Sequence, residues 1–235
     1  KFAPEYLRNS QGWILFPRDE QYRRELFPLL DLSAHPAKAN MFLVQSIVEY
    51  ISEPGQVIMD IMTGTGTILT AAISGRKVIC IEIEKNYQDI IEQGITSLEN
   101  YSPGISDLIT LIPGDCAKVL PIYGIDHIIF SPPYAQIMTK KKLTSSLAVS
   151  LGDGILTYSK HPDNIANLNE FLYHQRMEII YRKALESLNP EGTLTIIIKD
   201  HMRDRKRIFL GERAKRDCER LGFKFFEQYK WLAPG

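Results

Sequence analysis

Short, continuous apolar runs recur along this chain with polar segments between them. The runs lie at residues 56–61, 77–83, 108–112, 127–130, 193–199 and 223–232. Runs of four to eight apolar residues without regular polar interruptions are typical of strands that are buried on both faces of a sheet. The pattern therefore predicts about six strands, spread over most of the chain.

The segments between these runs carry apolar residues at helical spacing. Helices are expected at residues 37–52, 67–74, 85–99, 170–188 and 211–221. Pro54-Gly55, Gly75 and Gly222 stand where three of these helices would end, because glycine and proline terminate helices. Strands that alternate with helices predict an α/β fold with a doubly wound, mostly parallel sheet and helices on both faces.

Two stretches do not follow this alternation. Residues 1–34 mix aromatic residues, prolines and arginines without a period, and we interpret them as a packed arm with one short helix. Residues 135–168 contain many small polar residues, and a loop of that length inside a domain is usually functional. We therefore expect an N-terminal arm, 1–34, and one domain, 35–235, in which 135–168 is a mobile loop that faces the substrate.

Composition narrows the class of protein but not its partner. With 44% apolar and 24% charged residues, the 235-residue chain is typical of soluble globular proteins. The 28 basic and 28 acidic residues give a net charge of zero, so overall charge does not indicate a polyanionic partner. Cys80, Cys116 and Cys218 lack CxxC spacing and are odd in number, which favours a reducing cytoplasm over a disulfide framework. Cys80 and Cys116 lie beside apolar runs and are expected to be small core residues. The sequence shows neither a membrane-length apolar run nor a signal-peptide pattern.

A glycine-containing loop follows the first predicted strand. The residues Asp60-Ile61-Met62-Thr63-Gly64-Thr65-Gly66-Thr67 stand where that strand gives way to a helix. Glycines here allow a tight bend and a close approach to a ligand. The loop is not G-x-G-x-x-G, and it lacks the lysine of a phosphate-binding loop. It therefore suits a ligand that ends in an amino acid, whose ammonium group Asp60 would meet.

Two further acids follow the next two strands. Glu82 stands 22 positions after Asp60, where an acid accepts hydrogen bonds from ribose hydroxyls. Asp115 follows the third strand and would meet an adenine amino group. Taken singly, these features have simpler explanations: a turn at the glycines, a solvated strand end at Glu82 and a helix N-cap at Asp115. Three acids at the ends of successive strands together favour a nucleoside-binding site.

The fourth strand ends in Ser131-Pro132-Pro133-Tyr134 instead of an ordinary turn. Two prolines remove two N–H donors and leave rigid carbonyl acceptors. Such a rim suits a planar base with an exocyclic amine, because hydrogen bonds to Ser131 and to the Pro132 carbonyl would aim the nitrogen lone pair at a methyl donor. Tyr134 would stack on the base. The alternative explanation is a proline-stiffened strand end with a core tyrosine.

Four segments, taken in order, resemble the S-adenosylmethionine-dependent DNA amino-methyltransferases. They are "DIMTGTGT", "IEIEKNY", "GDCAKVL" and "SPPY", and the serine of the last segment looks most like the cytosine-N4 branch. Upstream, "AHPAKANMFLVQSIVEYI" resembles the methionine-binding motif of that family, although His35-Pro36 could also be a lead-in to a helix. The resemblance covers about residues 33–235 and implies a Rossmann-like methyltransferase fold with a seven-stranded sheet.

The resemblance also implies roles for individual residues. S-adenosylmethionine would be the cofactor, S-adenosylhomocysteine the product, and no metal is implied. Ser131, Pro132, Pro133 and Tyr134 would be catalytic. The implied cofactor-binding residues are His35, Pro36, Lys38, Asp60, Thr63, Gly64, Thr65, Gly66, Thr67, Glu82, Asp115 and Ser131.

Charged segments near the catalytic tetrapeptide are candidates for contacts with nucleic acid. An enzyme that modifies a base rotates it out of the duplex, while basic side chains hold the phosphates. The candidates are Lys140, Lys141 and Lys142, the run "RDRKR" at 203–207, and Lys199 and Asp200 at the end of the fifth strand. Such runs also occur on solvated faces, but the position of the lysines straight after the tetrapeptide favours contact with the substrate.

The combined signals predict a DNA cytosine-N4 methyltransferase of a prokaryote or phage, acting on double-stranded DNA in a restriction–modification setting. Adenine N6 of DNA and base amines of RNA are the alternatives. A non-catalytic partner subunit is a further alternative, which the intact tetrapeptide disfavours. Since the sequence stops soon after the last predicted strand, we expect target recognition to come from a homodimer or a separate subunit.

Overall fold

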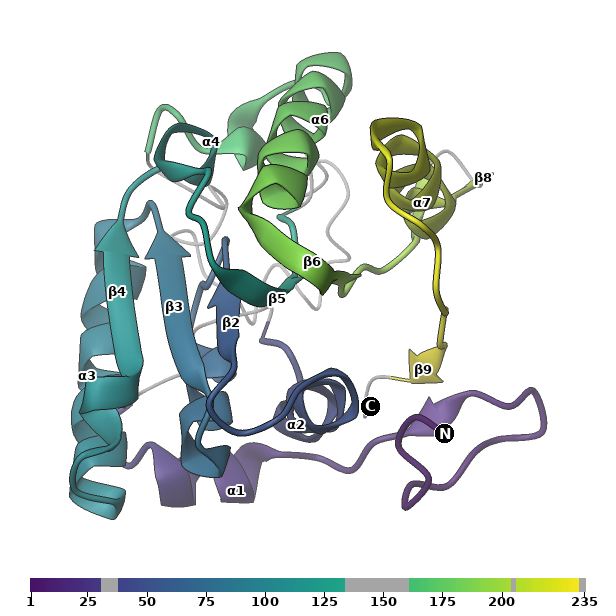
Figure 1. Cartoon of the computed structure of the whole chain (residues 1–235). Helices are drawn as coiled ribbons and strands as arrows, with labels where there is room; N and C mark the ends of the chain where they lie inside the picture. The colour runs from purple at the N-terminus through teal and green to yellow at the C-terminus, as the bar shows by residue number, and fades with distance from the viewer. Residues whose placement is uncertain (31–37, 134–160, 204–205, 233–235) are drawn as a thin grey trace, which may run out of the picture.

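The computed structural model describes residues 1–30, 38–133, 161–203 and 206–232. Its central element is a five-stranded sheet in the order β4-β3-β2-β5-β6, in which every neighbouring pair is parallel (Figure 1). The strands are β2 (Val57–Asp60), β3 (Lys77–Glu82), β4 (Ile109–Pro113), β5 (Ile125–Phe130) and β6 (Leu188–Ile196). The predicted doubly wound parallel sheet is thus confirmed, and its strand order reverses at β2.

Helices connect the strands close to where the sequence predicts them. The α-helices are α1 (Glu20–Leu26), α2 (Met41–Ile51), α3 (Lys85–Tyr101), α4 (Cys116–Val119), α6 (Glu170–Ser187) and α7 (Leu210–Leu221). The 3₁₀ helices are η1 (Thr67–Ser74), η2 (Ile105–Leu108) and η4 (Ile165–Asn167). Helix α2 begins later than expected because Asn40 caps it, accepting a hydrogen bond of 3.1 Å from the Leu43 N–H.

The sheet has five strands within the described residues, so the expectation of seven was wrong. The apolar segment 223–232 forms only the short strand β9 (Trp231–Leu232), which pairs with β1 (Ile14–Leu15) of the arm and not with the sheet. β7 (His201–Arg203) and β8 (Lys206–Ile208) pair separately as an antiparallel ladder. Phe226 is 77% exposed, so 223–230 does not bury the alternate side chains of a sheet strand. Figure 1 shows this segment running apart from β6.

Consecutive residues of the strands pack into two cores on opposite faces of the sheet. Ile58 and Ile129 belong to one core, which also contains residues of α2, η1, α3 and the arm. Met59 and Ile128 belong to the other core, which contains residues of α4, α6 and α7. This alternation is the physical reason why the strands read as unbroken apolar runs, since both faces are covered.

Two local features concern β6 and α6. Within β6 the register with β5 shifts, and Glu191 adopts a φ of 66°. On α6, Phe171 is 70% exposed, whereas Tyr173 is buried. Residues two apart on a helix point about 200° from each other, so only one of these two rings can face the core. No helix in the described part of the chain is long and apolar enough to cross a membrane.

The core under α6 provides a test of the fold. Phe130 is 1% exposed, and its ring centroid lies 6.4 Å from that of Tyr181. Replacing Phe130 with alanine should lower the free energy of unfolding by about 3–5 kcal/mol, because the substitution removes a buried ring and leaves a cavity. Phe226→Ala, at a position that is 77% exposed, should change it by less than about 0.5 kcal/mol. Urea denaturation measures both, and equal effects would contradict the described packing.

Candidate active site

A cavity of about 1820 Å³ lies at the carboxyl ends of the central strands and continues along β6. Its lining includes Asp60 after β2, Glu82 at the end of β3, Asp115 after β4 and Ser131 after β5. In a doubly wound sheet, ligands bind outside the carboxyl ends of the strands, where the strand order reverses. The residues that the sequence singled out at four different strand ends therefore line one cavity.

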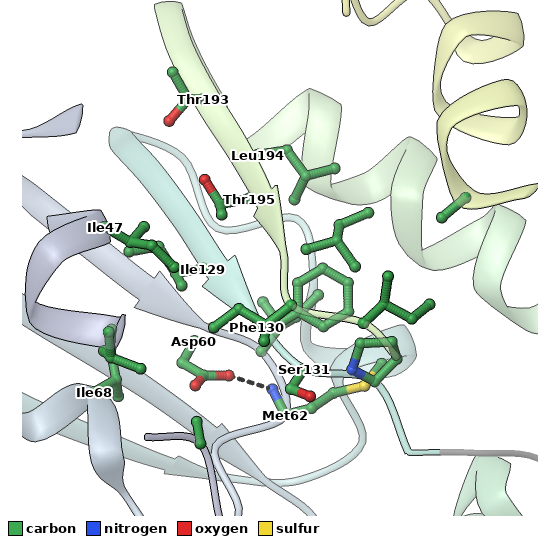
Figure 2. A pocket seen from close by; sticks show the side chains of 18 of the residues that line it. Ile47, Asp60, Met62, Ile68, Ile129, Phe130, Ser131, Thr193, Leu194 and Thr195 are labelled. Carbon is green, nitrogen blue, oxygen red and sulfur yellow. Dashed lines mark hydrogen bonds between the residues drawn. The ribbon is translucent and has the colours of Figure 1, made fainter. Parts of the chain in front are cut away.

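Asp60 ends the central strand and faces this cavity. Its Oδ1 accepts a hydrogen bond of 3.0 Å from the Met62 N–H, which Figure 2 shows as a dashed line. Burial raises the pKa of the Asp60 carboxyl to about 7, and the nearby charge of Glu82 adds to the rise. A cation placed against such a group restores the charged form, so the site suits an ammonium ligand.

Glu82 holds the glycine loop in place. Its Oε2 accepts a hydrogen bond of 2.6 Å from the Gly64 N–H, and its Oε1 accepts one of 2.9 Å from the Glu84 N–H. Gly64 has a φ of 57°, which a residue with a side chain seldom adopts. Each carboxylate oxygen carries two lone pairs, so Glu82 can still accept hydrogen bonds from ribose hydroxyls. Burial also raises the pKa of Glu82 to about 7.

The threonines of the loop are buried and face several backbone groups. Thr63 Oγ1 donates a hydrogen bond either to the Asp60 carbonyl, at 3.1 Å, or to the Ile81 carbonyl, at 3.2 Å. Thr65 and Thr67 are buried and line the cavity. Gly66 precedes η1 with a φ of 80°, and a Cβ there would lie 3.0 Å from Leu69 Cδ1. The sequence "TGTGT" thus combines hydroxyls that fasten the loop with glycines that allow its bend.

Asp115 has two structural partners that bear on its expected contact with adenine. Its Oδ1 accepts a hydrogen bond of 2.9 Å from the Ala117 N–H and caps α4, as the simpler explanation of this residue supposed. Its Oδ2 forms an ion pair of 2.7 Å with Arg176 Nη2 of α6. A role in adenine binding would use the remaining lone pairs, with Arg176 orienting the carboxylate.

Sequence reasoning missed Arg176, Glu84 and Asn164, which join distant segments at this site. Glu84 is 8% exposed, and its Oε1 accepts a hydrogen bond of 2.9 Å from Asn164 Nδ2. Glu84 and Asn164 both line the cavity. Glu84 could have been recognised as a site residue, because it lies two residues after Glu82. Nothing near Asn164 in the sequence indicated that its partner lies 80 residues away.

Ser131, Pro132 and Pro133 follow β5 at the same edge of the sheet. β2 and β5 pair with Met59 opposite Ile128, so Ser131 emerges beside the loop that starts at Asp60. Figure 2 shows Ser131 near Asp60 and Met62. Ser131 is exposed and Pro132 is buried, so the hydroxyl is accessible from the cavity on a rigid support.

The remaining predicted residues fall into two groups. Lys38, Lys199 and Asp200 line the cavity, and Asp200 Oδ2 forms an ion pair of 3.2 Å with Arg207. The residues that lie outside the described part are His35, Pro36, Tyr134, Lys140, Lys141 and Lys142. Among the described residues, no group of His, Cys, Asp and Glu could hold a metal ion. All three cysteines are buried and free, which confirms Cys80 and Cys116 as core residues.

The structure is similar in fold to several solved proteins. The structure of precorrin 8w decarboxylase from Methanobacterium thermoautotrophicum is 19% identical with a TM-score of 0.52, covering 89% of this chain and 82% of that one. TrmN from Thermus thermophilus is 20% identical with a TM-score of 0.48, covering 75% of this chain and 42% of that one. A putative rRNA methylase from Clostridium thermocellum is 16% identical with a TM-score of 0.47, covering 80% and 84%. At these identities, the likeness concerns the fold alone.

The sequence itself matches the family described as DNA methylase over residues 7–93. A search of curated proteins found no match. The family match supports an amino-methyltransferase, an enzyme class that uses S-adenosylmethionine as its methyl donor. The matched stretch runs from the arm to α3 and includes the glycine loop and Glu82. It ends before residues 131–134 and so does not distinguish cytosine N4 from adenine N6.

The buried acids predict how the stability of the ligand-free protein depends on pH. The pKa of Asp60 and that of Glu82 are about 7 in the folded protein, above their ordinary values of 3.8 and 4.5. The folded state therefore binds more protons than the unfolded state between about pH 4 and pH 7, and the free energy of unfolding should fall as the pH rises through that window. In the Asp60→Asn variant, the free energy of unfolding should fall less between pH 5 and pH 7.5 than in the wild type, as measured by urea denaturation.

Asp126→Asn, at the opposite edge of the sheet, is the matched control. Burial alone would raise the pKa of Asp126, but hydrogen bonds from the Val57 N–H and Asn189 Nδ2 outweigh it and lower the pKa. The stabilising effect of Asp126 is therefore lost only at lower pH, below this window. An Asp60→Asn variant with the same pH dependence as the wild type would show that Asp60 stays charged in the folded protein.

Proposed function

We propose that this protein transfers a methyl group from S-adenosylmethionine to the exocyclic N4 amine of a cytosine in DNA. The observation that carries the proposal is the common cavity at the carboxyl edge of β2, β3 and β5. The acids of the glycine loop and the second strand line it together with Ser131 and Pro132. A methyl donor and an amine acceptor would meet there without a change in the fold.

The acids would bind the donor. Asp60 would accept hydrogen bonds from the ammonium of the methionine end, and Glu82 would accept them from the ribose hydroxyls. Asp115 would address the adenine. The raised pKa values of Asp60 and Glu82 support this assignment, because perturbed acids that cluster in a cleft are typical of functional sites. S-adenosylmethionine supplies an electrophilic methyl group bound to a sulfonium.

The tetrapeptide would bind the acceptor. The amine of cytosine is a poor nucleophile because its lone pair is delocalised into the ring. The Ser131 hydroxyl and the Pro132 carbonyl would accept its hydrogen bonds and orient the lone pair toward the methyl group, and Tyr134 would stack on the base. When the nitrogen gains the methyl group, it loses a proton, which Ser131 can pass to water because its side chain is exposed.

The family match over residues 7–93 supports DNA as the substrate, and the target base would be rotated out of the duplex. Lys199 is exposed at the rim of the cavity and is a candidate for a phosphate contact. Lys140, Lys141 and Lys142 remain predicted contacts, and recognition by a homodimer or a separate subunit likewise remains a prediction. Adenine N6 is the second candidate target, because the tetrapeptide requires only an exocyclic amine.

A methyl-transfer assay tests the proposal. The protein is incubated with labelled S-adenosylmethionine and either genomic DNA or total RNA, and the nucleosides from the digested product are identified by mass. N4-methylcytosine in DNA is the expected product. N6-methyladenine would replace the proposed base by the second candidate, and label found only in RNA would overturn the proposal.

The catalytic role of the tetrapeptide predicts a specific variant effect. Ser131→Ala should lower the turnover number by about tenfold or more, because the amine loses one of the acceptors that orient it. Ser131 is also an implied cofactor-binding residue, but Asp60 and Glu82 are unchanged, so the affinity for S-adenosylhomocysteine should fall less than the turnover number, by at most about threefold. Ser102→Ala, at the exposed end of α3 and outside the cavity lining, is the control. Full turnover in the Ser131→Ala variant would contradict the assignment.

A further inference from the structure

Arg23 of the N-terminal arm is buried although it is charged. It lies in α1 and is 6% exposed. Its Nη2 forms an ion pair of 2.7 Å with Asp19 Oδ2, and the same Oδ2 accepts a hydrogen bond of 2.8 Å from the Met41 N–H. A buried guanidinium needs partners for its donors, because an unpaired buried charge is costly.

The other partners of Arg23 belong to the two segments that enclose one end of the cavity. Its Nη2 donates to the Ala39 carbonyl at 2.8 Å, just before α2. Its Nη1 donates to Thr67 Oγ1 at 3.2 Å, at the start of η1. Ala39 and Thr67 both line the cavity, whereas Arg23 does not. The planar side chain of Arg23 therefore connects the segment before α2 with the end of the glycine loop, and it lies outside the cavity lining.

We propose that Arg23 is a positioning residue for the donor site and that the arm is part of that site. The inference rests on the proposed function, because it takes the cavity end at Ala39 and Thr67 as the pocket for the methionine end. The rigid fork of the guanidinium sets the separation of the two segments. Lysine cannot reproduce this, since its ammonium is a single point on a flexible stem.

The chain contains a matched comparison in Arg76, which joins the other ends of the same two helices. Arg76 is also 6% exposed. Its Nη2 donates to the Ser52 carbonyl at 2.6 Å, after α2, and its Nη1 donates to the Ser74 carbonyl at 2.9 Å, at the end of η1. Neither Ser52 nor Ser74 lines the cavity. The two arginines thus have the same exposed fraction and each connects α2 with η1, but Arg23 also forms an ion pair with Asp19, and only the contacts of Arg23 reach the cavity wall.

The test compares Arg23→Lys with Arg76→Lys. Both variants should lower the melting temperature, because each loses buried hydrogen bonds. Arg23→Lys should also weaken the binding of S-adenosylhomocysteine about five- to twentyfold in calorimetric titration, whereas Arg76→Lys should change it less than about twofold. Equal affinities in the two variants would overturn the inference, because Arg23 would then act on stability alone.

Thr67→Val provides a second measurement that keeps the ion pair of Arg23 with Asp19. If Arg23 acts through Thr67, the Thr67→Val variant should also bind S-adenosylhomocysteine more weakly than the wild type. The loss of binding free energy in the double variant Arg23→Lys/Thr67→Val should then be smaller than the sum of the losses in the two single variants. Wild-type affinity in Thr67→Val would overturn the inference even if Arg23→Lys failed to fold. Fully additive losses would overturn it where all three variants fold. Absence of S-adenosylhomocysteine binding by the wild type would instead overturn the proposed function.

Discussion

β2 pairs in parallel with β3 on one side and with β5 on the other, and the rest of the site depends on this central position. Parallel strands end at the same edge of a sheet, so residues that follow different strands meet there although they are far apart in the sequence. Asp60, Glu82 and Ser131 span 71 positions of the chain and line one cavity for this reason. A slip in the β2–β5 register would separate the donor site from the tetrapeptide.

The site lowers the stability of the fold that carries it. Asp60 and Glu82 are acids placed close together in a poorly solvated region, which raises the pKa of both. Hydrogen bonds from Met62, Gly64 and Glu84 compensate only in part. A bound ammonium group would remove part of the cost, so ligand binding and stability are expected to be linked. Perturbed acids of this kind are more typical of binding sites than of structural positions.

The arm and the C-terminal segment illustrate where sequence reasoning succeeded and where it did not. The arm was expected to pack with one short helix; α1 lies in this segment, and Phe2 and Ile14 are buried. Its contact with the glycine loop through Arg23 could not be foreseen, because a single arginine in an aperiodic segment carries no signal of burial. The segment 223–232 was expected to join the sheet from its apolar composition, but its exposed phenylalanines and its pairing with β1 show that composition alone does not select a strand partner.

The sequence by itself determined most strands of the central sheet and the helices between them, and it placed acids at the ends of three strands. Apolar runs and helical spacing located four strands of the parallel sheet closely, because burial on both faces leaves a local pattern. Asp60, Glu82 and Asp115 each follow a predicted strand, and this spacing indicated a nucleoside site. Tertiary structure alone decided the number of strands in the sheet, the ion pair of Asp115 with Arg176 and the placement of Arg23 behind Thr67. These features depend on contacts between distant segments, and such contacts leave no periodic trace in the chain.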